Sequence, residues 1–356
     1  MDMRLKNLGF TDRIYKIAEM NSGLFPGRVI GQNKEIYKLA TATGELLGEI
    51  SGKMRHLANK MTDYPTVGDF VLIDRDDQSS GKAIIHQIVP RKSLVVRKAA
   101  GTSKDIQTVA ANIDTIFICM SLNNDFNIRR LERYLAISFD SGAMPVIVLT
   151  KVDLCNNLEQ VLAEVEKVAL GVDIVITSGL SKDGYLDIKK YILPEQTVAF
   201  IGSSGVGKST LINRLLGEDL QETREIRKDD KGRHATTSRE LKLIPGGGAV
   251  IDTPGMRELG LENVNISMAF NDIEELAINC RFKDCQHENE PGCRVKEAID
   301  EGELEESRLH SYKKLKKESK YEGLNSKQIE KEKIDEMFSG FGGIKNARDF
   351  VKKRNK

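Results

Sequence analysis

The sequence predicts an α/β protein built in three parts, and three observations lead to this prediction. Short apolar runs separated by turn residues come first, an alternation of strands and helices follows, and three cysteines cluster with a histidine near helical segments. A chain of 356 residues exceeds the size of one hydrophobic core. We therefore expect domains at residues 1–100, 101–262 and 263–356.

The first part is predicted to be a small antiparallel barrel of the OB type. Five apolar runs lie between about residues 25 and 90 at near-regular spacing, with turn residues between them. Basic residues are frequent here: Arg28, Lys34, Lys53, Arg55, Lys60, Arg91, Lys92, Arg97 and Lys98. Because barrels of this type expose a face that binds nucleic acid, we predict RNA binding, and an ordinary β-domain with a solvated face is the alternative.

From residue 112 the pattern changes to strands that alternate with helices. Buried, mostly parallel strands are predicted at 115–120, 145–150, 172–177, 197–201 and 249–251. Apolar residues at helical spacing in NIRRLERYLAIS and LEQVLAEVEKVAL predict two helices between them. A further pair of strands is predicted in RELKLIPGGGAVID, joined by a glycine turn. The middle part is therefore predicted to be a doubly wound sheet.

Residues 202–209, GSSGVGKS, match the phosphate-loop pattern GxxxxGK[ST] between a predicted strand and a predicted helix. In such a loop the backbone N–H groups and the helix N-terminus face the phosphates. Lys208 would reach the β- and γ-phosphates and assist catalysis, and the Ser209 hydroxyl would bind Mg²⁺. The residues expected to contact nucleotide are Gly202, Ser203, Ser204, Gly205, Val206, Gly207, Lys208, Ser209 and Thr210.

A second box, Asp252-Thr253-Pro254-Gly255, follows the strand predicted at 249–251. Asp252 would hold Mg²⁺ through water, and the Gly255 N–H would meet the γ-phosphate. The tetrapeptide alone is a common turn. Its place after a strand and downstream of a phosphate loop indicates a nucleotide switch.

Thr150-Lys151-Val152-Asp153 ends another predicted strand and indicates guanine recognition. The Asp153 carboxylate can accept hydrogen bonds from guanine N1–H and N2–H₂, a pair that adenine lacks, and the Lys151 stem would lie along the base. Ser178 would contact guanine O6 through its backbone N–H. Thr150 replaces the Asn of most GTPases, so it keeps a hydroxyl to tether the phosphate loop but loses an amide. We expect looser nucleotide binding with retained specificity.

These boxes occur in an unusual order, because the base-reading residues at 150–153 and 177–178 precede the phosphate loop. The sequence therefore predicts a circularly permuted P-loop GTPase domain. In these boxes, and over nearly the whole chain, the sequence resembles the RsgA (YjeQ/YloQ) family of bacterial GTPases, which act on the small ribosomal subunit. The resemblance implies GTP/GDP and Mg²⁺ as ligands, and the small ribosomal subunit and its rRNA as partners.

The residue that would orient the hydrolytic water is not obvious. Met256 follows Gly255, where Ras-like enzymes carry a glutamine, and an apolar side chain cannot position water. The segment 232–238 resembles the family's switch GRHTTT, with Ala235 in place of the first threonine. The resemblance gives the catalytic role to His234, whose neutral imidazole can orient water. The alternative is that His234 contacts RNA or solvent.

The same segment is expected to supply a second Mg²⁺ ligand beside Ser209. Thr236 and Thr237 both follow His234. Which of them reaches the ion is open, and Thr237 is favoured.

A cluster of cysteines in the last part predicts a metal site. Cys280, Cys285, His287 and Cys293 supply three thiolates and one imidazole, and their spacing matches the family's metal site. Four N/S ligands with no fifth candidate suit a closed, structural Zn²⁺ site, whereas catalytic zinc would keep one position open. We expect one Zn²⁺ and helices at 268–277 and 293–320 around it. A Lys/Glu-rich tail follows.

The net charge of +1 conceals an uneven distribution. Residues 1–108 carry 17 Lys+Arg against 12 Asp+Glu, residues 109–307 carry 22 against 34, and residues 308–356 carry 15 against 7. Basic ends around an acidic centre suit a polyanionic partner, and a solvated surface with a basic tail is the alternative. Neither a signal-peptide pattern nor a long apolar run occurs, so we expect a cytoplasmic protein without membrane contact. We also expect a monomer.

Together, these patterns and the resemblance predict a GTP hydrolase that binds the small ribosomal subunit and couples hydrolysis to late subunit maturation and factor release. Two other functions stay open. A nucleotide-gated RNA-binding module with little intrinsic hydrolysis would fit Met256. A P-loop kinase or ATPase would share residues 202–209 but would need neither the base-reading box nor the basic flanks.

Overall fold

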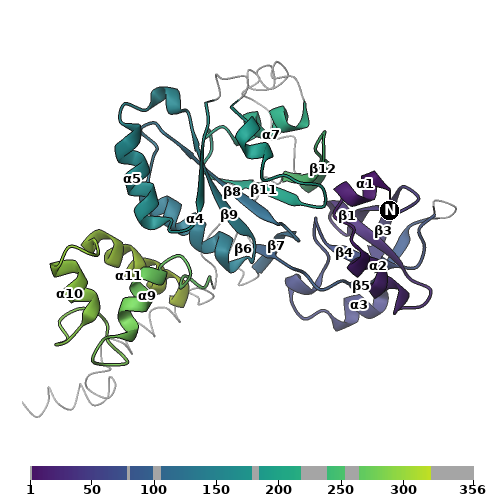
Figure 1. Ribbon diagram of the computed structural model, residues 1–356. Helices are drawn as coiled ribbons and strands as arrows, with labels where there is room; N and C mark the ends of the chain where they lie inside the picture. The colour runs from purple at the N-terminus through teal and green to yellow at the C-terminus, as the bar shows by residue number, and fades with distance from the viewer. Residues whose placement is uncertain are drawn as a thin grey trace, which may run out of the picture.

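The computed structural model describes residues 2–77, 81–98, 106–178, 184–217, 239–252 and 264–321. Figure 1 shows three bodies, with the N-terminal barrel on one side of the central sheet and the C-terminal helices on the other. Among the described residues, no helix is both long and apolar enough to cross a bilayer.

The first five strands form a closed barrel. They are β1 (Phe25–Asn33), β2 (Ile36–Ala40), β3 (Glu45–Ile50), β4 (Phe70–Ile73) and β5 (Ala83–Ile88). They lie in the order β1-β2-β3-β5-β4, and β4 also pairs with β1, which closes the ring. β3 and β5 run parallel, and the other described neighbours are antiparallel. The predicted OB-type barrel is confirmed.

Short helices that the sequence analysis did not predict surround this barrel. They are α1 (Met3–Asn7), α2 (Asp12–Glu19), α3 (Gly52–Leu57) and the 3₁₀ turn η1 (Met61–Asp63). Ser51 begins α3, because its hydroxyl accepts a hydrogen bond from the Met54 N–H at 3.1 Å. Ile14 and Ala18 are buried, so α2 packs an apolar side against β1.

The middle part is the predicted doubly wound sheet. Its strands are β8 (Thr115–Ser121), β9 (Met144–Thr150), β10 (Asp173–Ile176), β11 (Thr197–Ile201), β12 (Arg239–Leu243) and β13 (Ala249–Asp252). They lie in the order β10-β9-β8-β11-β13-β12, and all pairs are parallel except β12 with β13. Every residue of β8 is buried, as its unbroken apolar run predicted.

The helices of this part are α4 (Ile128–Asp140), α5 (Leu158–Val168), α6 (Leu186–Lys189) and α7 (Lys208–Leu216). α4 and α5 lie where the apolar spacing predicted them, α7 is the helix expected after the phosphate loop, and the short α6 was not predicted. Asn127 caps α4 by accepting a hydrogen bond from the Arg130 N–H at 3.0 Å. α4 packs on β8, β9 and α5, and its residues Leu131 and Leu135 are buried.

The barrel and the central sheet are joined by strand pairing that the sequence did not predict. β12 pairs antiparallel with β1, with Gly31 opposite Glu240, so an 11-stranded sheet runs through both bodies. A hairpin of β6 (Leu94–Lys98) and β7 (Ile106–Ala111) also lies between them. The boundary expected between residues 100 and 101 falls within this hairpin, and the division into domains stays a proposal.

The C-terminal helices differ from the prediction in one respect. They are α9 (Asn271–Ile278), α10 (Arg294–Asp300) and α11 (Glu306–Tyr321). The single helix predicted at 293–320 is wrong, because Gly302 has φ of 78° and stops α10. The N–H groups of Glu303 and Leu304 fold back to the carbonyl of Ala298, which satisfies the end of the helix.

Arg28 was predicted on the RNA-binding surface of the barrel, and this is wrong. It is 1% exposed. Its guanidinium donates to the Leu8 carbonyl, to the Gly68 carbonyl at 3.3 Å and to the Thr197 hydroxyl at 2.8 Å, and it lies 4.7 Å from the centre of the Phe70 ring. Burial lowers the pKa of Arg28 to about 10. This arginine therefore joins the barrel to the start of β11.

Arg91 was also expected on that surface and has a structural role instead. Its side chain is 15% exposed and donates two hydrogen bonds of 2.7 Å to the fully buried Asp69 carboxylate. It also donates to the carbonyls of Thr62 and Tyr64. Among the members of this set whose side chains the structure describes, Lys34, Lys53, Arg55, Lys60 and Lys92 are exposed.

Candidate functional site

The predicted nucleotide boxes converge at one edge of the central sheet. Thr150 ends β9, Ser178 follows β10, Gly202 follows β11 and Asp252 ends β13. These strands are parallel, so their carboxyl ends lie at the same edge. Segments up to about a hundred residues apart in sequence are thus brought together at the place where open α/β sheets bind ligands.

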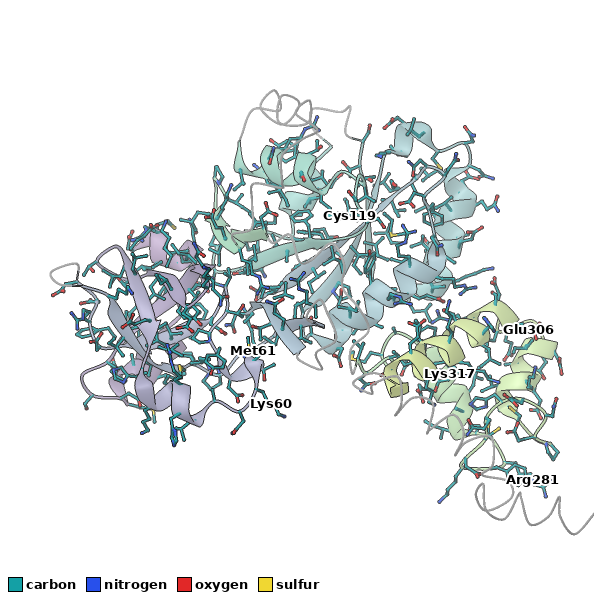
Figure 2. The ribbon with its side chains drawn as sticks, turned by 180° about the vertical axis from the view of Figure 1, so that it is seen from behind. Lys60, Met61, Cys119, Arg281, Glu306 and Lys317 are labelled. Carbon is teal, nitrogen blue, oxygen red and sulfur yellow. The ribbon has the colours of Figure 1, made fainter. Side chains whose placement is uncertain are left out.

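The phosphate loop depends on its glycines. Gly202, Gly205 and Gly207 have φ of 138°, 78° and 103°, a region that favours glycine. A Cβ atom at Gly202 would lie 2.3 Å from the carbonyl oxygen of Cys119 in β8. Cys119 lies in the central sheet (Figure 2), and burial raises the pKa of its thiol to about 12. The thiol therefore stays protonated and forms part of the wall beneath the loop.

Lys208 begins α7 and bends back over the loop. Its ammonium donates to the carbonyls of Gly202 at 2.6 Å and Ser203 at 2.5 Å, and the residue is 8% exposed. A phosphate-loop lysine reaches the β- and γ-phosphates. The loop mouth between these carbonyls therefore marks the expected position of those phosphates. Ser209 and Thr210 lie in the first turn of the same helix and are half-buried.

Thr150 tethers the phosphate loop as expected. Its buried hydroxyl lies 2.6 Å from the Val206 carbonyl oxygen and 3.3 Å from that of Met120. A single hydroxyl therefore connects β8, β9 and the loop. An asparagine here would supply two N–H donors, so the threonine has one donor fewer for the same task.

The base-reading residues are also brought together. The Ser178 hydroxyl donates to the Asp153 carboxylate at 2.6 Å across a sequence separation of 25 residues. Asp153 is exposed on the turn η2 (Val152–Leu154), and Lys151 before it has φ of 57°. A carboxylate offers about four acceptor positions, so one bond from Ser178 leaves capacity for two donors of a guanine. The arrangement suits a guanine base between the ends of β9 and β10.

Several predicted residues lie outside the described part of the chain. They are His234, Thr236, Thr237, Gly255 and Met256. Asp252 is described and is exposed at the end of β13, where it lies opposite Glu240 of β12.

Arg130 lies at the phosphate loop and was not singled out from the sequence. It follows the cap of α4 and donates to the Ser203 hydroxyl at 2.6 Å and to the Asp125 carboxylate at 3.0 Å. Its place shortly after the carboxyl end of β8 was the signal that could have identified it, since that end lies at the nucleotide edge.

The four predicted metal ligands form one compact group. Their ligand atoms all lie within 4.8 Å of one another. Cys280 Sγ is 3.6 Å from His287 Nδ1 and 3.9 Å from Cys293 Sγ, and His287 Nδ1 is 3.4 Å from Cys293 Sγ. In a tetrahedron around zinc, bonds of about 2.3 Å to sulfur and about 2.0–2.1 Å to nitrogen separate the ligand atoms by about 3.6–3.8 Å. The three distances among Cys280, His287 and Cys293 lie close to these values, so the four residues fit one Zn²⁺ after only a small contraction of the cluster.

Backbone contacts hold the metal loop in shape. Gly292 has φ of 73°, and its carbonyl accepts from the Arg281 N–H at 3.0 Å. The Glu290 carboxylate accepts from two backbone N–H groups, and these bonds lower its pKa to about 2. From α11, Lys313 donates to the His287 carbonyl at 3.0 Å. The loop is thereby attached to the helices around it.

A buried ionic cluster joins the C-terminal helices to α4. Arg308 of α11 donates to Glu132 at 2.9 Å and to both oxygens of Asp272, at 2.6 Å and 2.8 Å. Glu132 is fully buried and also accepts from Ser311 at 2.5 Å and from Arg129 at 2.8 Å. The sequence analysis missed this cluster, because a charged residue on a helix usually indicates a solvated face.

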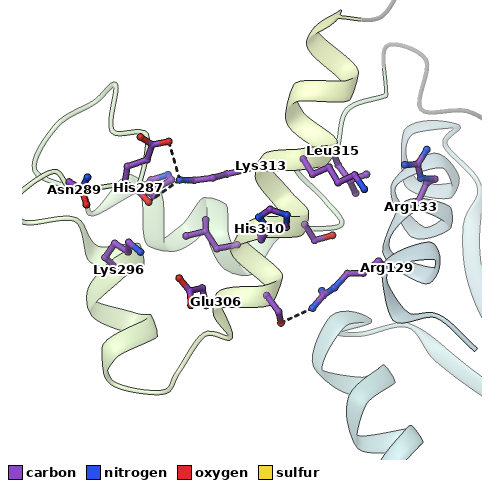
Figure 3. A pocket seen from close by; sticks show the side chains of 14 residues that line it. Arg129, Arg133, His287, Asn289, Lys296, Glu306, His310, Lys313 and Leu315 are labelled. Carbon is purple, nitrogen blue, oxygen red and sulfur yellow. Dashed lines mark hydrogen bonds and ion pairs between the residues drawn. The ribbon is translucent and has the colours of Figure 1, made fainter.

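Beside this cluster, a cavity of about 810 Å³ lies between α4, α10, α11 and the metal loop. Figure 3 shows Arg129 and Arg133 of α4 beside α11, and Arg129 donates to the Ser307 hydroxyl at 2.6 Å. Cationic side chains outnumber acidic ones in its lining: Arg129, Arg133, Lys296, Lys313 and Lys314 against Glu288 and Glu306. The cavity therefore suits an anion and is separate from the phosphate loop.

Comparison with known proteins agrees with this geometry. The family model described as RsgA GTPase matches residues 88–262. Small ribosomal subunit biogenesis GTPase RsgA 2 of Lactiplantibacillus plantarum is 47% identical over 349 residues, which cover 98% of each chain. RsgA of Methanosarcina acetivorans is 41% identical over 353 residues, which cover 97% of this chain and 94% of that protein.

Two solved structures share the architecture. YjeQ from Thermotoga maritima has a TM-score of 0.62 and 26% identity, and the match covers 83% of this chain and 98% of that one. YloQ, described as a circularly permuted GTPase, has a TM-score of 0.61 and 24% identity over 84% of this chain and 96% of that one, which supports the fold.

Proposed function

Because the chain belongs to the RsgA GTPase family, we propose that it couples GTP hydrolysis to late maturation of the small ribosomal subunit and to its own release from that subunit. The observation that carries this proposal is the convergence of the phosphate loop, the Thr150 tether and the Asp153–Ser178 pair at one sheet edge. That edge offers both a phosphate site and a guanine site.

In this proposal each group at the edge has one task. Asp153 and Lys151 hold the guanine base, with the Ser178 backbone at O6. The phosphate loop and Lys208 hold the β- and γ-phosphates. Ser209 and Thr237, with Asp252 through water, would hold Mg²⁺, which would neutralise phosphate charge. The Gly255 N–H would meet the γ-phosphate.

For hydrolysis we assign the water-orienting role to His234. Met256 occupies the position where Ras-like enzymes carry glutamine, so another side chain must supply this function. A neutral imidazole can accept a hydrogen bond from water near physiological pH. Lys208 neutralises charge that develops on the phosphates.

The partner we propose is small-subunit rRNA, bound by a monomeric, cytoplasmic protein. Exposed cations on the barrel, such as Lys53 and Lys60, and the cationic cavity beside α11 support contact with phosphate groups. One Zn²⁺ held by Cys280, Cys285, His287 and Cys293 would keep the metal loop in shape beside that cavity.

The decisive experiment is co-sedimentation with small ribosomal subunits in GDP and in a non-hydrolysable GTP analogue, together with phosphate release from GTP. We expect attachment with the analogue, release with GDP, and hydrolysis that rises when subunits are added. Attachment without multiple-turnover hydrolysis would favour the RNA-binding module instead. Stabilisation by ADP equal to that by GDP would favour a kinase or ATPase.

A variant at the base site makes this test specific. Asp153→Asn should lower GDP affinity by about 10²-fold or more, because the amide presents a donor to guanine N1–H, and it should favour xanthosine diphosphate. Asp187→Asn, which changes an exposed carboxylate paired with Lys190, is the matched control. Unchanged GDP affinity in Asp153→Asn would place the base elsewhere.

A further inference from the structure

The helix α4 carries three arginines that face different partners. Arg129 donates to Glu132 and to Ser307 of the C-terminal part, and Arg133 donates to Glu318 of α11 at 2.6 Å. Arg130 instead donates to the Ser203 hydroxyl of the phosphate loop. Neighbouring positions on the helix point in different directions, so Arg130 alone of these three contacts the nucleotide edge.

Ser203 is in contact with two cationic side chains. Arg130 Nη1 lies 2.6 Å from its hydroxyl oxygen, and Lys208 Nζ lies 2.5 Å from its carbonyl oxygen. Because a phosphate-loop lysine reaches the β- and γ-phosphates, Ser203 lies at the terminal-phosphate end of the site. The Arg130 guanidinium therefore contacts the same residue, Ser203, as the Lys208 ammonium that is expected to bind those phosphates.

The ion pair of Arg130 leaves it able to serve a phosphate. Its carboxylate partner Asp125 is 3.0 Å away, and the two side chains are 32% and 45% exposed, so water screens their attraction. A guanidinium has five N–H donors in a planar fork that matches phosphate oxygens. It can hold Ser203 and Asp125 and still present donors toward the loop mouth.

We propose that Arg130 is a second phosphate-site cation, which favours a nucleoside triphosphate over the diphosphate. This inference rests on the nucleotide site proposed above. The diphosphate lacks the terminal phosphate, so it loses the attraction to Arg130 while it keeps the contacts of Lys208 and the loop backbone. Arg130 thereby helps the protein distinguish its two nucleotide states.

The test is equilibrium binding of GDP and of a non-hydrolysable GTP analogue to the full chain with Mg²⁺. Arg130→Ala should weaken binding of the analogue about tenfold, the size of one charge-assisted hydrogen bond, and should change GDP binding by less than about twofold. Arg130→Lys should keep part of the preference, because it retains the charge but loses the planar fork. Arg133→Ala on the same helix is the matched control and should change neither affinity.

A fourth variant separates charge from loop structure. Asp125→Asn removes the carboxylate beside Arg130, so it should raise the preference for the analogue, and a fall would show that the ion pair merely shapes the loop. An equal loss of GDP and analogue binding in Arg130→Ala would likewise overturn the inference. If the wild type bound neither nucleotide, the proposed function itself would fail. If the wild type bound both and Arg130→Ala matched Arg133→Ala, only the role of Arg130 would be refuted.

Discussion

A buried arginine lies at each of the two joints between the central sheet and its neighbours, and the two joints use different chemistry. On the barrel side, Arg28 donates to two carbonyls and one hydroxyl, and β1 pairs with β12. On the C-terminal side, Arg308 is paired with the carboxylates of Glu132 and Asp272. Each guanidinium also lies over a phenylalanine ring.

The protonation behaviour of the two arginines reflects this difference. Burial lowers the pKa of Arg28 to about 10, and the nearby carboxylates offset only part of that effect. Burial also acts to lower the pKa of Arg308, but its hydrogen bonds to Asp272 and Glu132 outweigh this and raise its pKa above the usual value. The barrel joint thus depends on backbone pairing, and the C-terminal joint depends on opposite charges. We infer that salt and charge-changing substitutions weaken the C-terminal joint more than the barrel joint.

Removing the metal should change the C-terminal side most and the barrel least. Structural zinc supplies on the order of 10 kcal/mol or more of folding free energy to small metal domains. Chelation or Cys285→Ser should therefore unfold residues 280–293 and expose the amides of α9 and α10 to hydrogen exchange. Protection in β1 and GDP affinity should stay within about twofold, because the barrel and the sheet have their own cores.

The matched control for this prediction is Cys155→Ser, which changes a half-buried cysteine outside the metal cluster and should leave the zinc content unchanged. Elemental analysis that found no stoichiometric zinc in protein prepared without chelator would contradict the metal assignment.

Breaking the C-terminal joint at Arg308 should have the next largest effect. Arg308→Met removes the cation that pairs with the fully buried Glu132 and with Asp272. Because a buried carboxylate then loses an opposite charge, we expect a loss of about 3–5 kcal/mol in unfolding free energy. Urea unfolding followed by hydrogen exchange on α11 measures this loss. Arg294→Met, which removes ion pairs of α10 that water screens, should cost far less unfolding free energy than Arg308→Met. Equal losses in the two variants would show that burial of the cluster is not what matters.

Breaking the barrel joint should cost less unfolding free energy than breaking the C-terminal joint. Arg28→Met leaves the carbonyls of Leu8 and Gly68 without this donor but strands no carboxylate in direct contact, so about 2–3 kcal/mol is expected. The measurement is the same urea titration, read on the barrel strands. A loss larger than that of Arg308→Met would reverse the ranking of the two joints.

Salt should produce the smallest and most selective effect. The pairs Arg133–Glu318 and Lys167–Glu305 connect the sheet domain to α11 and its N-terminal flank and are partly exposed. Because water reaches both pairs, salt screens their attraction readily. Raising the salt concentration to about 1 M should lower hydrogen-exchange protection in α11 by a few-fold while β1 stays unchanged. A similar fall in both elements would mean that the barrel joint is equally electrostatic.

Local patterns in the sequence by themselves predicted the strands of the central sheet, the barrel runs, the phosphate loop and the cluster of three cysteines and a histidine. Each of these depends on the spacing of nearby residues: an unbroken apolar run for β8, glycines at fixed positions for the loop, and three cysteines and a histidine between 280 and 293. The alternation of polar and apolar residues and the backbone freedom of glycine act over a few residues, so they can be read without a structure.

Only the tertiary structure decided where the charged side chains lie. Arg28 meets Thr197 across 169 residues, Glu132 meets Arg308 across 176, and Arg130 meets Ser203 across 73. A guanidinium or carboxylate is buried only when distant segments bring it hydrogen-bonding partners, because desolvation is otherwise too costly. The pairing of β1 with β12 has the same origin, since the edge of one sheet becomes available to another only after both have folded.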